Sequence, residues 1–215
     1  MARNPGLARA KQAYTDEARR LATQSMTQLD QANVTPDALT ISGVALCIGG
    51  SVAVFFEYAG WGFYWLGAAL FVVGSVLDIL DGALARSRGM GSPFGAFLDS
   101  TVDRVGEGFI ISAIGLVFMR HDQMWALAFA FAAVAGSFLV SYTRARAEAL
   151  GLKGDVGFGS RAERVVVITI GLVLAPLHEL ILPIVIALLA ATAWFTVVQR
   201  ILFVRKQLSG PITGT

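Results

Sequence analysis

Long apolar stretches alternate with short polar ones along most of this chain. Each stretch is on the order of 20 residues, the length that an α-helix needs to cross a ~30 Å hydrocarbon layer. The strict alternation of a membrane β-barrel is missing, and only helices satisfy their own backbone in lipid as separate segments. The pattern predicts an all-α integral membrane protein with six transmembrane helices. They run approximately over residues 37–57, 61–85, 95–118, 124–147, 161–178 and 180–203.

The segment before the first stretch has a mixed pattern. Between residues 5 and 30, apolar side chains such as Leu7, Tyr14 and Leu21 recur at roughly helical spacing among Lys and Arg. This predicts an N-terminal amphipathic surface helix, with a solvated helix before the first span as the alternative. We therefore expect a juxtamembrane helix over 1–34, a transmembrane domain over 35–206 and a C-terminal tail over 207–215.

Two helix starts are marked in the sequence. Thr35-Pro36-Asp37 places a capping hydroxyl, a proline in the first turn and an acid near the positive end of the helix dipole. Ser160-Arg161-Ala162-Glu163 is typical of a capping box.

Composition and charge placement support a membrane topology. Hydrophobic residues make up 55% of the 215 residues and charged residues 15%, whereas soluble domains carry nearer ~25% charge. Of the 17 Lys and Arg, only Arg120 falls in a connection after the first, third or fifth stretch. This positive-inside bias predicts a multi-pass protein of the cell membrane with both termini in the cytoplasm. The lone Cys47 excludes an intrachain disulfide and is expected to fill space in the core.

Four aspartates lie in or beside the second and third stretches. A carboxylate in a membrane helix costs roughly 2.5–3.5 kcal/mol, so the four need a compensating partner. Asp78 and Asp81 are three residues apart and Asp99 and Asp103 four apart, so each pair projects from one helix face. The short linker between the two helices makes them antiparallel neighbours. The sequence therefore predicts a cytoplasmic-side site for one or two Mg²⁺ or Mn²⁺ ions, which take oxygen ligands and retain positions for substrate phosphates.

The residues around the aspartates suit a phosphorylated ligand. Gly82 and Ala85 remove bulk beside the acids, Arg86 offers a forked donor, and Gly95 allows close approach at the next helix. For any one glycine, helix packing in lipid is the alternative explanation.

These residues form a recognisable signature. The pattern Asp78-x2-Asp81-Gly82-x2-Ala85-Arg86-x8-Gly95-x3-Asp99-x3-Asp103 resembles that of the CDP-alcohol phosphotransferase family, membrane enzymes that make phospholipids. The resemblance implies a homodimer and a metal-dependent reaction in which an alcohol attacks a CDP-linked lipid and CMP leaves. It implies that the four aspartates bind metal and that Asp103 is the general base. It also implies that the CDP-lipid is held by Asp37, Gly82, Ala85, Arg86 and Gly95.

The acceptor is indicated by a basic cluster near the cytoplasmic ends of the last three helices, since Arg forks match phosphate. Setting topology is the alternative role for any one of these residues. The sequence around Arg144, Arg161 to Arg164 and Arg200 resembles bacterial phosphatidylinositol phosphate synthases. This implies CDP-diacylglycerol and inositol 3-phosphate as substrates, with Arg144, Arg164 and Arg200 on the acceptor phosphate. Glycerol 3-phosphate is the alternative acceptor, and an archaeal ether lipid is the alternative donor.

Two other classes of membrane protein also have acidic sites of this kind. Membrane prenyltransferases also hold magnesium diphosphate with aspartates, but on well-separated helices, whereas both aspartate pairs here fall within 26 residues. A cation transporter could have an acidic site, but it would not need Gly82, Ala85 and Arg86 at these spacings. Glu107 is expected to pair with Arg104 or another Arg rather than to ligate metal. His121 and His178 lie in predicted outer loops with no chemistry assigned, and no nucleic-acid partner is expected.

Overall fold

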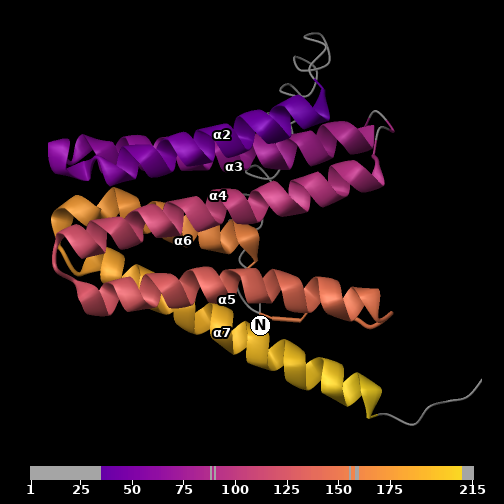
Figure 1. The fold of residues 1–215 in the computed structure, drawn as a ribbon. Helices are drawn as coiled ribbons and strands as arrows, with labels where there is room; N and C mark the ends of the chain where they lie inside the picture. The colour runs from indigo at the N-terminus through magenta and orange to yellow at the C-terminus, as the bar shows by residue number, and fades with distance from the viewer. Residues whose placement is uncertain (1–34, 88, 90, 155, 158–159, 210–215) are drawn as a thin grey trace, which may run out of the picture.

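In the part of the chain that the structure describes, six α-helices run back and forth along a shared direction (Figure 1). The structure is a computed structural model that describes residues 35–87, 89, 91–154, 156–157 and 160–209. The α-helices are α2 (Pro36–Phe55), α3 (Gly62–Ser87), α4 (Pro93–Arg120), α5 (Met124–Ala149), α6 (Arg161–Leu174) and α7 (Ile181–Leu208). Two short 3-10 helices, η1 (Glu57–Ala59) and η2 (Ala175–Leu177), lie at the opposite end from the N-terminus of α2.

The all-α prediction is confirmed over this part of the chain. Four of the helices, α2, α3, α5 and α7, are long and apolar enough to cross a membrane. The other two occupy predicted stretches but differ in character: α6 has 14 residues, and α4 has 28 but carries two aspartates and one arginine in its first half. Helix α7 continues two residues past the expected domain end at 206. The predicted amphipathic helix over 1–34 lies outside the described residues.

Side-chain caps fix the starts of α2, α4 and α6. The Thr35 hydroxyl accepts a hydrogen bond from the Ala38 amide at 3.3 Å, and Pro36 occupies the first turn, as predicted. The predicted capping box of α6 is also present, with the Ser160 amide 2.8 Å from Glu163 Oε2. Ser92 caps α4 by accepting from the Gly95 amide at 2.9 Å. These caps satisfy amides that would otherwise be unpaired at the helix ends that flank the aspartates.

Helices α2 and α3 approach each other closely through glycine. A Cβ added at Gly74 would lie 2.5 Å from the Gly43 carbonyl oxygen, and one at Gly43 would lie 2.8 Å from the Gly74 oxygen. Small residues at such crossings let helix backbones pack directly in lipid. The close contact places the start of α2 beside the end of α3, where Asp78 and Asp81 lie.

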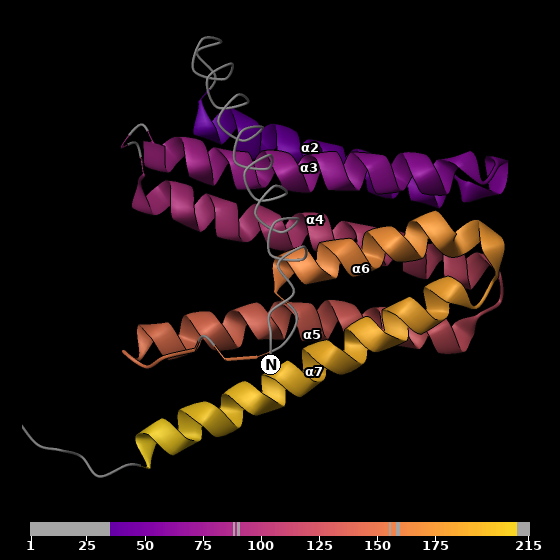
Figure 2. The same cartoon turned by 180° about the vertical axis from the view of Figure 1, so that it is seen from behind.

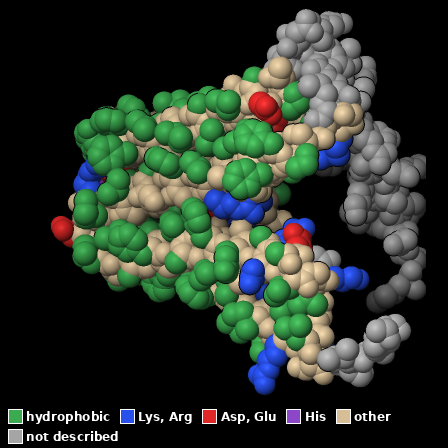
Figure 3. All heavy atoms as spheres, turned by 45° about the vertical axis from the view of Figure 1, so that its right-hand side comes forward, with side chains coloured by type: hydrophobic (Ala, Val, Ile, Leu, Met, Phe, Trp, Pro, Cys, Tyr) green, Lys and Arg blue, Asp and Glu red, His purple; other side chains and the backbone are tan. Residues whose placement is uncertain are grey.

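The main apolar core lies around the second half of α4. Ile110, Ile114 and Phe118 are fully or almost fully buried there, against Phe71 of α3 and Ile168 of α6. Cys47 is buried in the same cluster, as expected for a packing residue. On the face that Figure 3 shows, hydrophobic side chains cover the flanks, while charged ones gather at the ends and beside a hollow.

Helix α6 is shorter than its neighbours and begins partway along the bundle (Figure 2). The connection from α5 therefore turns back into the molecule before α6 starts. This brings the first turn of α6 to the depth of the aspartates.

Candidate active site

Three of the predicted metal-binding aspartates form one cluster. Asp78 of α3 and Asp99 and Asp103 of α4 each offer a carboxylate oxygen, and these oxygens lie within 4.8 Å of one another. Asp78 is buried, and the other two are half-buried. The antiparallel pairing of α3 and α4 thus brings acids from both predicted pairs together.

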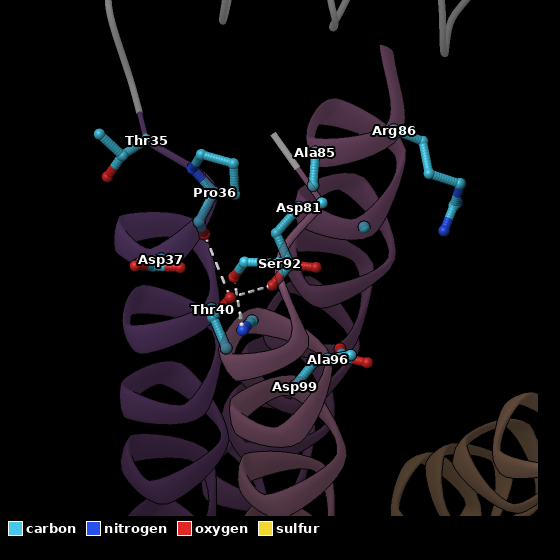
Figure 4. A pocket seen from close by; sticks show the side chains of 13 residues that line it. Thr35, Pro36, Asp37, Thr40, Asp81, Ala85, Arg86, Ser92, Ala96 and Asp99 are labelled. Atoms are coloured by element: carbon cyan, nitrogen blue, oxygen red, sulfur yellow. Dashed lines mark hydrogen bonds between the residues drawn. The ribbon is translucent and has the colours of Figure 1, made fainter. Parts of the chain in front are cut away.

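Asp81 contacts helix α2 rather than the other three aspartates. Its Oδ2 accepts a hydrogen bond from the hydroxyl of Thr40 on α2, which also lies 3.1 Å from the Pro36 carbonyl oxygen (Figure 4). Residues three apart on a helix project about 60° from each other around its axis, so Asp78 faces α4 while Asp81 faces α2. The sequence predicted one quartet, whereas the structure gives a cluster of three acids with Asp81 to one side. No motif in the sequence points to Thr40.

The donor set fits a hard divalent cation. Carboxylate oxygens are the ligands that Mg²⁺ and Mn²⁺ prefer, and three converge here from two helices. Asp81 Oδ1 is buried and makes no hydrogen bond within the described part of the chain. A buried carboxylate oxygen without a donor is costly, and a cation would compensate it.

Arg161 reaches into the acid cluster from the start of α6. Its Nη1 contacts Asp78 Oδ2 and lies 2.6 Å from Asp103 Oδ1, so one guanidinium bridges α3 and α4. The sequence placed Arg161 in the cytoplasmic basic group and in the capping box, but gave no signal for this contact. The contact depends on the depth at which α6 begins.

A cavity of about 420 Å³ opens beside the acids, between the ends of α2, α3 and α4. Asp81 and Asp99 line it, which makes Asp99 common to the cavity and the acid cluster. Its lining also includes all five residues predicted to hold the CDP-lipid, Asp37, Gly82, Ala85, Arg86 and Gly95. A Cβ at Gly82 would lie 3.3 Å from Arg86 Nη1, so a larger residue there would crowd the guanidinium. Figure 4 shows the Thr40 hydroxyl directed at the Asp81 carboxylate in the lining of this cavity.

The site is closed on its inner side. Below Arg161 and Asp103 there is a void of only about 10 Å³, lined by Cys47, Phe71, Ile168 and neighbouring side chains. This is about the room that one water needs. Asp81 and Asp99 therefore line the open cavity, whereas Asp103 borders this small closed void.

Arg164, one turn after Arg161, is buried against Glu107 of α4. Its Nε donates to Glu107 Oε1 at 2.6 Å and its Nη2 to Oε2 at 2.8 Å. The Ser137 hydroxyl of α5 adds a bond to Oε1 at 2.6 Å. Glu107 thus pairs with an arginine, as expected, and that arginine is Arg164, since Arg104 bonds the Ser100 carbonyl.

The other two predicted acceptor arginines have different surroundings. Arg200 of α7 is buried, donating from Nε to the Val156 carbonyl at 2.8 Å and from Nη1 to the Val140 carbonyl. It thereby fastens the α5–α6 connection to α7. Arg144 is more than half exposed and pairs with Glu148 at 2.9 Å. The structure therefore gives the three arginines three separate sets of contacts.

The histidines lie apart from this site. His121 is at the far end of α4, where its Nε2 is 3.2 Å from Glu57 Oε1, and His178 Nδ1 accepts from the Leu180 amide at 3.1 Å. Both are near η1 and η2, at the end of the bundle opposite the aspartates.

The stretch of sequence that forms the acid cluster and the cavity matches a known protein family. The family model described as CDP-alcohol phosphatidyltransferase matches residues 33–199. The chain belongs to this family. It is accordingly a phospholipid-synthesising transferase, and the prenyltransferase and transporter alternatives are wrong.

Two similar proteins are named as synthases of inositol phosphate lipids. An archaetidylinositol phosphate synthase of Methanothermobacter thermautotrophicus is 37% identical over 180 residues, covering 83% of this chain and 87% of the relative. A phosphatidylinositol phosphate synthase of Mycolicibacterium smegmatis is 36% identical over 185 residues, covering 81% and 79%.

This chain shares its fold with solved structures of Mycobacterium tuberculosis phosphatidylinositol phosphate synthase. The form with CDP-DAG bound has a TM-score of 0.79 at 30% identity and covers 91% of this chain and 98% of that one. The form with manganese and citrate has a TM-score of 0.78 at 31% identity, covering 90% and 92%. The manganese in that structure agrees with the predicted Mg²⁺ or Mn²⁺ cofactor.

Proposed function

We propose that this enzyme transfers the phosphatidyl group of CDP-diacylglycerol to inositol 3-phosphate, releasing CMP and forming phosphatidylinositol phosphate. One observation carries the proposal: the cluster of Asp78, Asp99 and Asp103 adjoins a cavity lined by every residue expected to hold the CDP-lipid. Family membership supplies the reaction class. The names of the relatives supply the inositol phosphate acceptor.

The cavity between α2, α3 and α4 is the proposed donor site. Arg86 can donate to the diphosphate, and Gly82 and Ala85 leave room for the nucleotide against the α3 backbone. Gly95 does the same at the start of α4, and Asp37 lies at the rim contributed by α2. The acyl chains would remain in lipid while the nucleotide enters from water.

The four aspartates are the proposed metal ligands. Asp78, Asp99 and Asp103 would hold one ion, and the buried free oxygen of Asp81 together with Asp99 suits a second. Bound divalent ions neutralise the diphosphate and the charge that develops on departing CMP.

Asp103 is the proposed general base. The acceptor hydroxyl oxygen forms a bond to the lipid-linked phosphorus of the donor, the bond from that phosphorus to the CMP oxygen breaks, and the hydroxyl proton passes to the Asp103 carboxylate. Atoms and charge balance without a covalent enzyme intermediate. Asp103 lies one helical turn farther along α4 than Asp99, which lines the donor cavity, so the proposed base lies deeper in the site than the nucleotide would.

Arg144, Arg164 and Arg200 are the proposed acceptor-phosphate residues. Arg164 follows the bridging Arg161 by three residues and so lies on the same side of α6. Arg200 lines a separate cavity of about 360 Å³ between α5 and α7. Arg144 is exposed one helical turn from Glu148, and an anionic ligand would have to draw it from that pair.

The proposed topology places the site at the inner leaflet. All six α-helices would cross the cell membrane, with α4 and α6 tolerated because their charged residues face the bundle interior and the site. The charge bias puts both termini and the active site in the cytoplasm. The N-terminal surface helix and a homodimer complete the proposal, the latter by family resemblance.

A second donor is favoured by one specific finding. The archaeal relative at 37% identity is named for an archaetidyl product. The same site chemistry would serve that donor, because the nucleotide and diphosphate are shared and only the lipid chains differ.

The test is a substrate panel with the purified full chain in detergent and Mn²⁺ or Mg²⁺. CMP release is measured with CDP-diacylglycerol and inositol 3-phosphate, and with glycerol 3-phosphate, serine or free inositol in its place. We expect turnover with inositol 3-phosphate to exceed the others, and Asp103→Asn to reduce it at least 10²-fold, about the contribution of a general base. Preference for glycerol 3-phosphate would refute inositol 3-phosphate as the acceptor. Normal turnover of Asp103→Asn would refute Asp103 as the general base.

A further inference from the structure

The contact between Arg161 and two of the proposed metal ligands has a consequence for how the site takes up its ion. Arg161 lies within ion-pair distance of both Asp78 and Asp103, and its side chain is 28% exposed. Asp78 and Asp103 are two of the three acids whose oxygens converge. The guanidinium therefore contacts the carboxylates that a divalent ion would use.

We infer that Arg161 is an intramolecular cation that competes with the divalent metal for Asp78 and Asp103. This inference rests on the proposed metal-binding role of the aspartates. Arg161 would then set the metal affinity of the site without itself being a ligand.

Three carboxylates whose oxygens converge within 4.8 Å repel one another strongly in a partly desolvated site. A guanidinium bridging two of them relieves that repulsion and stabilises the metal-free protein. The same stabilisation must be given up when a divalent ion takes those oxygens, so it lowers the apparent metal affinity.

The fold makes this competition possible because Arg161 is on a different element from the acids. Arg161 is the first residue of α6, held in place by the Ser160–Glu163 capping box that spans it and by the Arg164–Glu107 pair one turn after it. Its long side chain can leave the acids without moving the helix. Arg164, anchored on Glu107, links α6 to α4 through side chains in either state.

The experiment measures Mn²⁺ binding by the purified full-length protein, from the loss of the free-ion electron paramagnetic resonance signal, with no substrate present. We expect Arg161→Gln to lower the Kd for Mn²⁺ on the order of tenfold, since removing a neighbouring like charge shifts such equilibria by one log unit or more. Lys206→Gln removes an exposed positive charge at the same end of the bundle and should leave the Kd unchanged.

A second readout is the melting temperature with EDTA and with saturating Mn²⁺. If Arg161 stabilises the metal-free state, Arg161→Gln should melt lower than wild type in EDTA, and Mn²⁺ should raise its melting temperature by more than it raises that of wild type. Arg161→Lys keeps the charge but not the fork, and should give an intermediate Kd. If Arg161→Gln does not fold, the Kd of Arg161→Lys tests the competition in its place.

The outcomes separate this inference from the proposed function. Wild-type protein that binds no Mn²⁺ would overturn both, because the aspartates would then hold no metal. Wild-type binding with an unchanged or higher Kd in Arg161→Gln and Arg161→Lys would overturn the competition alone.

Discussion

Arg164 of α6 holds Glu107 of α4 through two parallel hydrogen bonds, of 2.6 Å from Nε to Oε1 and 2.8 Å from Nη2 to Oε2. Only 9% of Arg164 and 6% of Glu107 are exposed. Glu107 is one helical turn beyond Asp103, and Arg164 one turn beyond Arg161. Two successive turns of α6 thus contact two successive turns of α4, which fixes the short helix against the acid cluster.

Glu107→Ala should destabilise the protein markedly. Removing one partner of a buried ion pair costs about 3–5 kcal/mol, because the remaining charge loses its compensation away from water. The variant should melt at a clearly lower temperature in detergent, measured by thermal unfolding monitored by circular dichroism.

The matched control is Glu148→Ala. Glu148 also pairs with an arginine, Arg144, at 2.9 Å, but both side chains are more than half exposed. Such surface pairs contribute less than about 1 kcal/mol. Equal shifts for Glu148→Ala and Glu107→Ala would contradict a special role for the buried pair.

Arg164→Lys should impair acceptor binding more than donor binding. Lysine keeps the positive charge near Glu107, so the fold should be retained, but it cannot present the planar fork that suits both carboxylate and phosphate. We expect the KM for inositol 3-phosphate to rise on the order of tenfold, equivalent to one charge-assisted hydrogen bond. The KM for CDP-diacylglycerol should stay near the wild-type value. Equal small changes in both constants would limit Arg164 to a structural role.

The helices and their starts could be predicted because they depend on local chemistry. Thr35 and Ser160 cap as expected, since a capping hydroxyl needs only amides two or three residues away. The end of α6 was predicted too late, at 178 rather than Leu174. Pro176 has no amide hydrogen to donate and forces the chain into the 3-10 helix η2, although hydrophobicity continues past it.

The site could be predicted only as far as spacing and motif define it. The signature residues do gather around one cavity and one acid cluster, because their spacing on two antiparallel helices determines their faces. The division of Asp81 from the other acids depends on Thr40, which lies on a third helix. The bridge made by Arg161 depends on how deep α6 begins, which follows from the path of the α5–α6 connection and not from any local pattern.

Gly74→Ala should destabilise the packing of α2 on α3. The added Cβ would lie 2.5 Å from the Gly43 carbonyl oxygen and 2.7 Å from Cys47 Sγ, so the helices would have to separate. Overpacking of this kind costs about 1–3 kcal/mol, visible as a lower melting temperature. Gly62→Ala, where a Cβ meets nothing within 4 Å, is the control on the same helix and should melt like wild type. A Gly74→Ala protein as stable as Gly62→Ala would show that α2 and α3 are not in tight contact.

Thr40→Val should weaken the donor site while leaving the acceptor site intact. Valine has nearly the shape of threonine but removes the hydroxyl that donates to Asp81, whose other carboxylate oxygen is already without a hydrogen bond among the described residues. Hydrogen bonds to charged groups contribute about 1.5–3 kcal/mol, so the KM for CDP-diacylglycerol should rise on the order of tenfold. Thr40→Ser restores the hydroxyl without the methyl group and should recover most of the donor affinity. Failure of serine to recover it would mean that packing of the methyl group, and not the bond to Asp81, supports the cavity. A parallel rise in the KM for inositol 3-phosphate would instead show that Thr40 acts on the whole site, since Asp81 and Asp99 share the cavity and Asp99 belongs to the acid cluster.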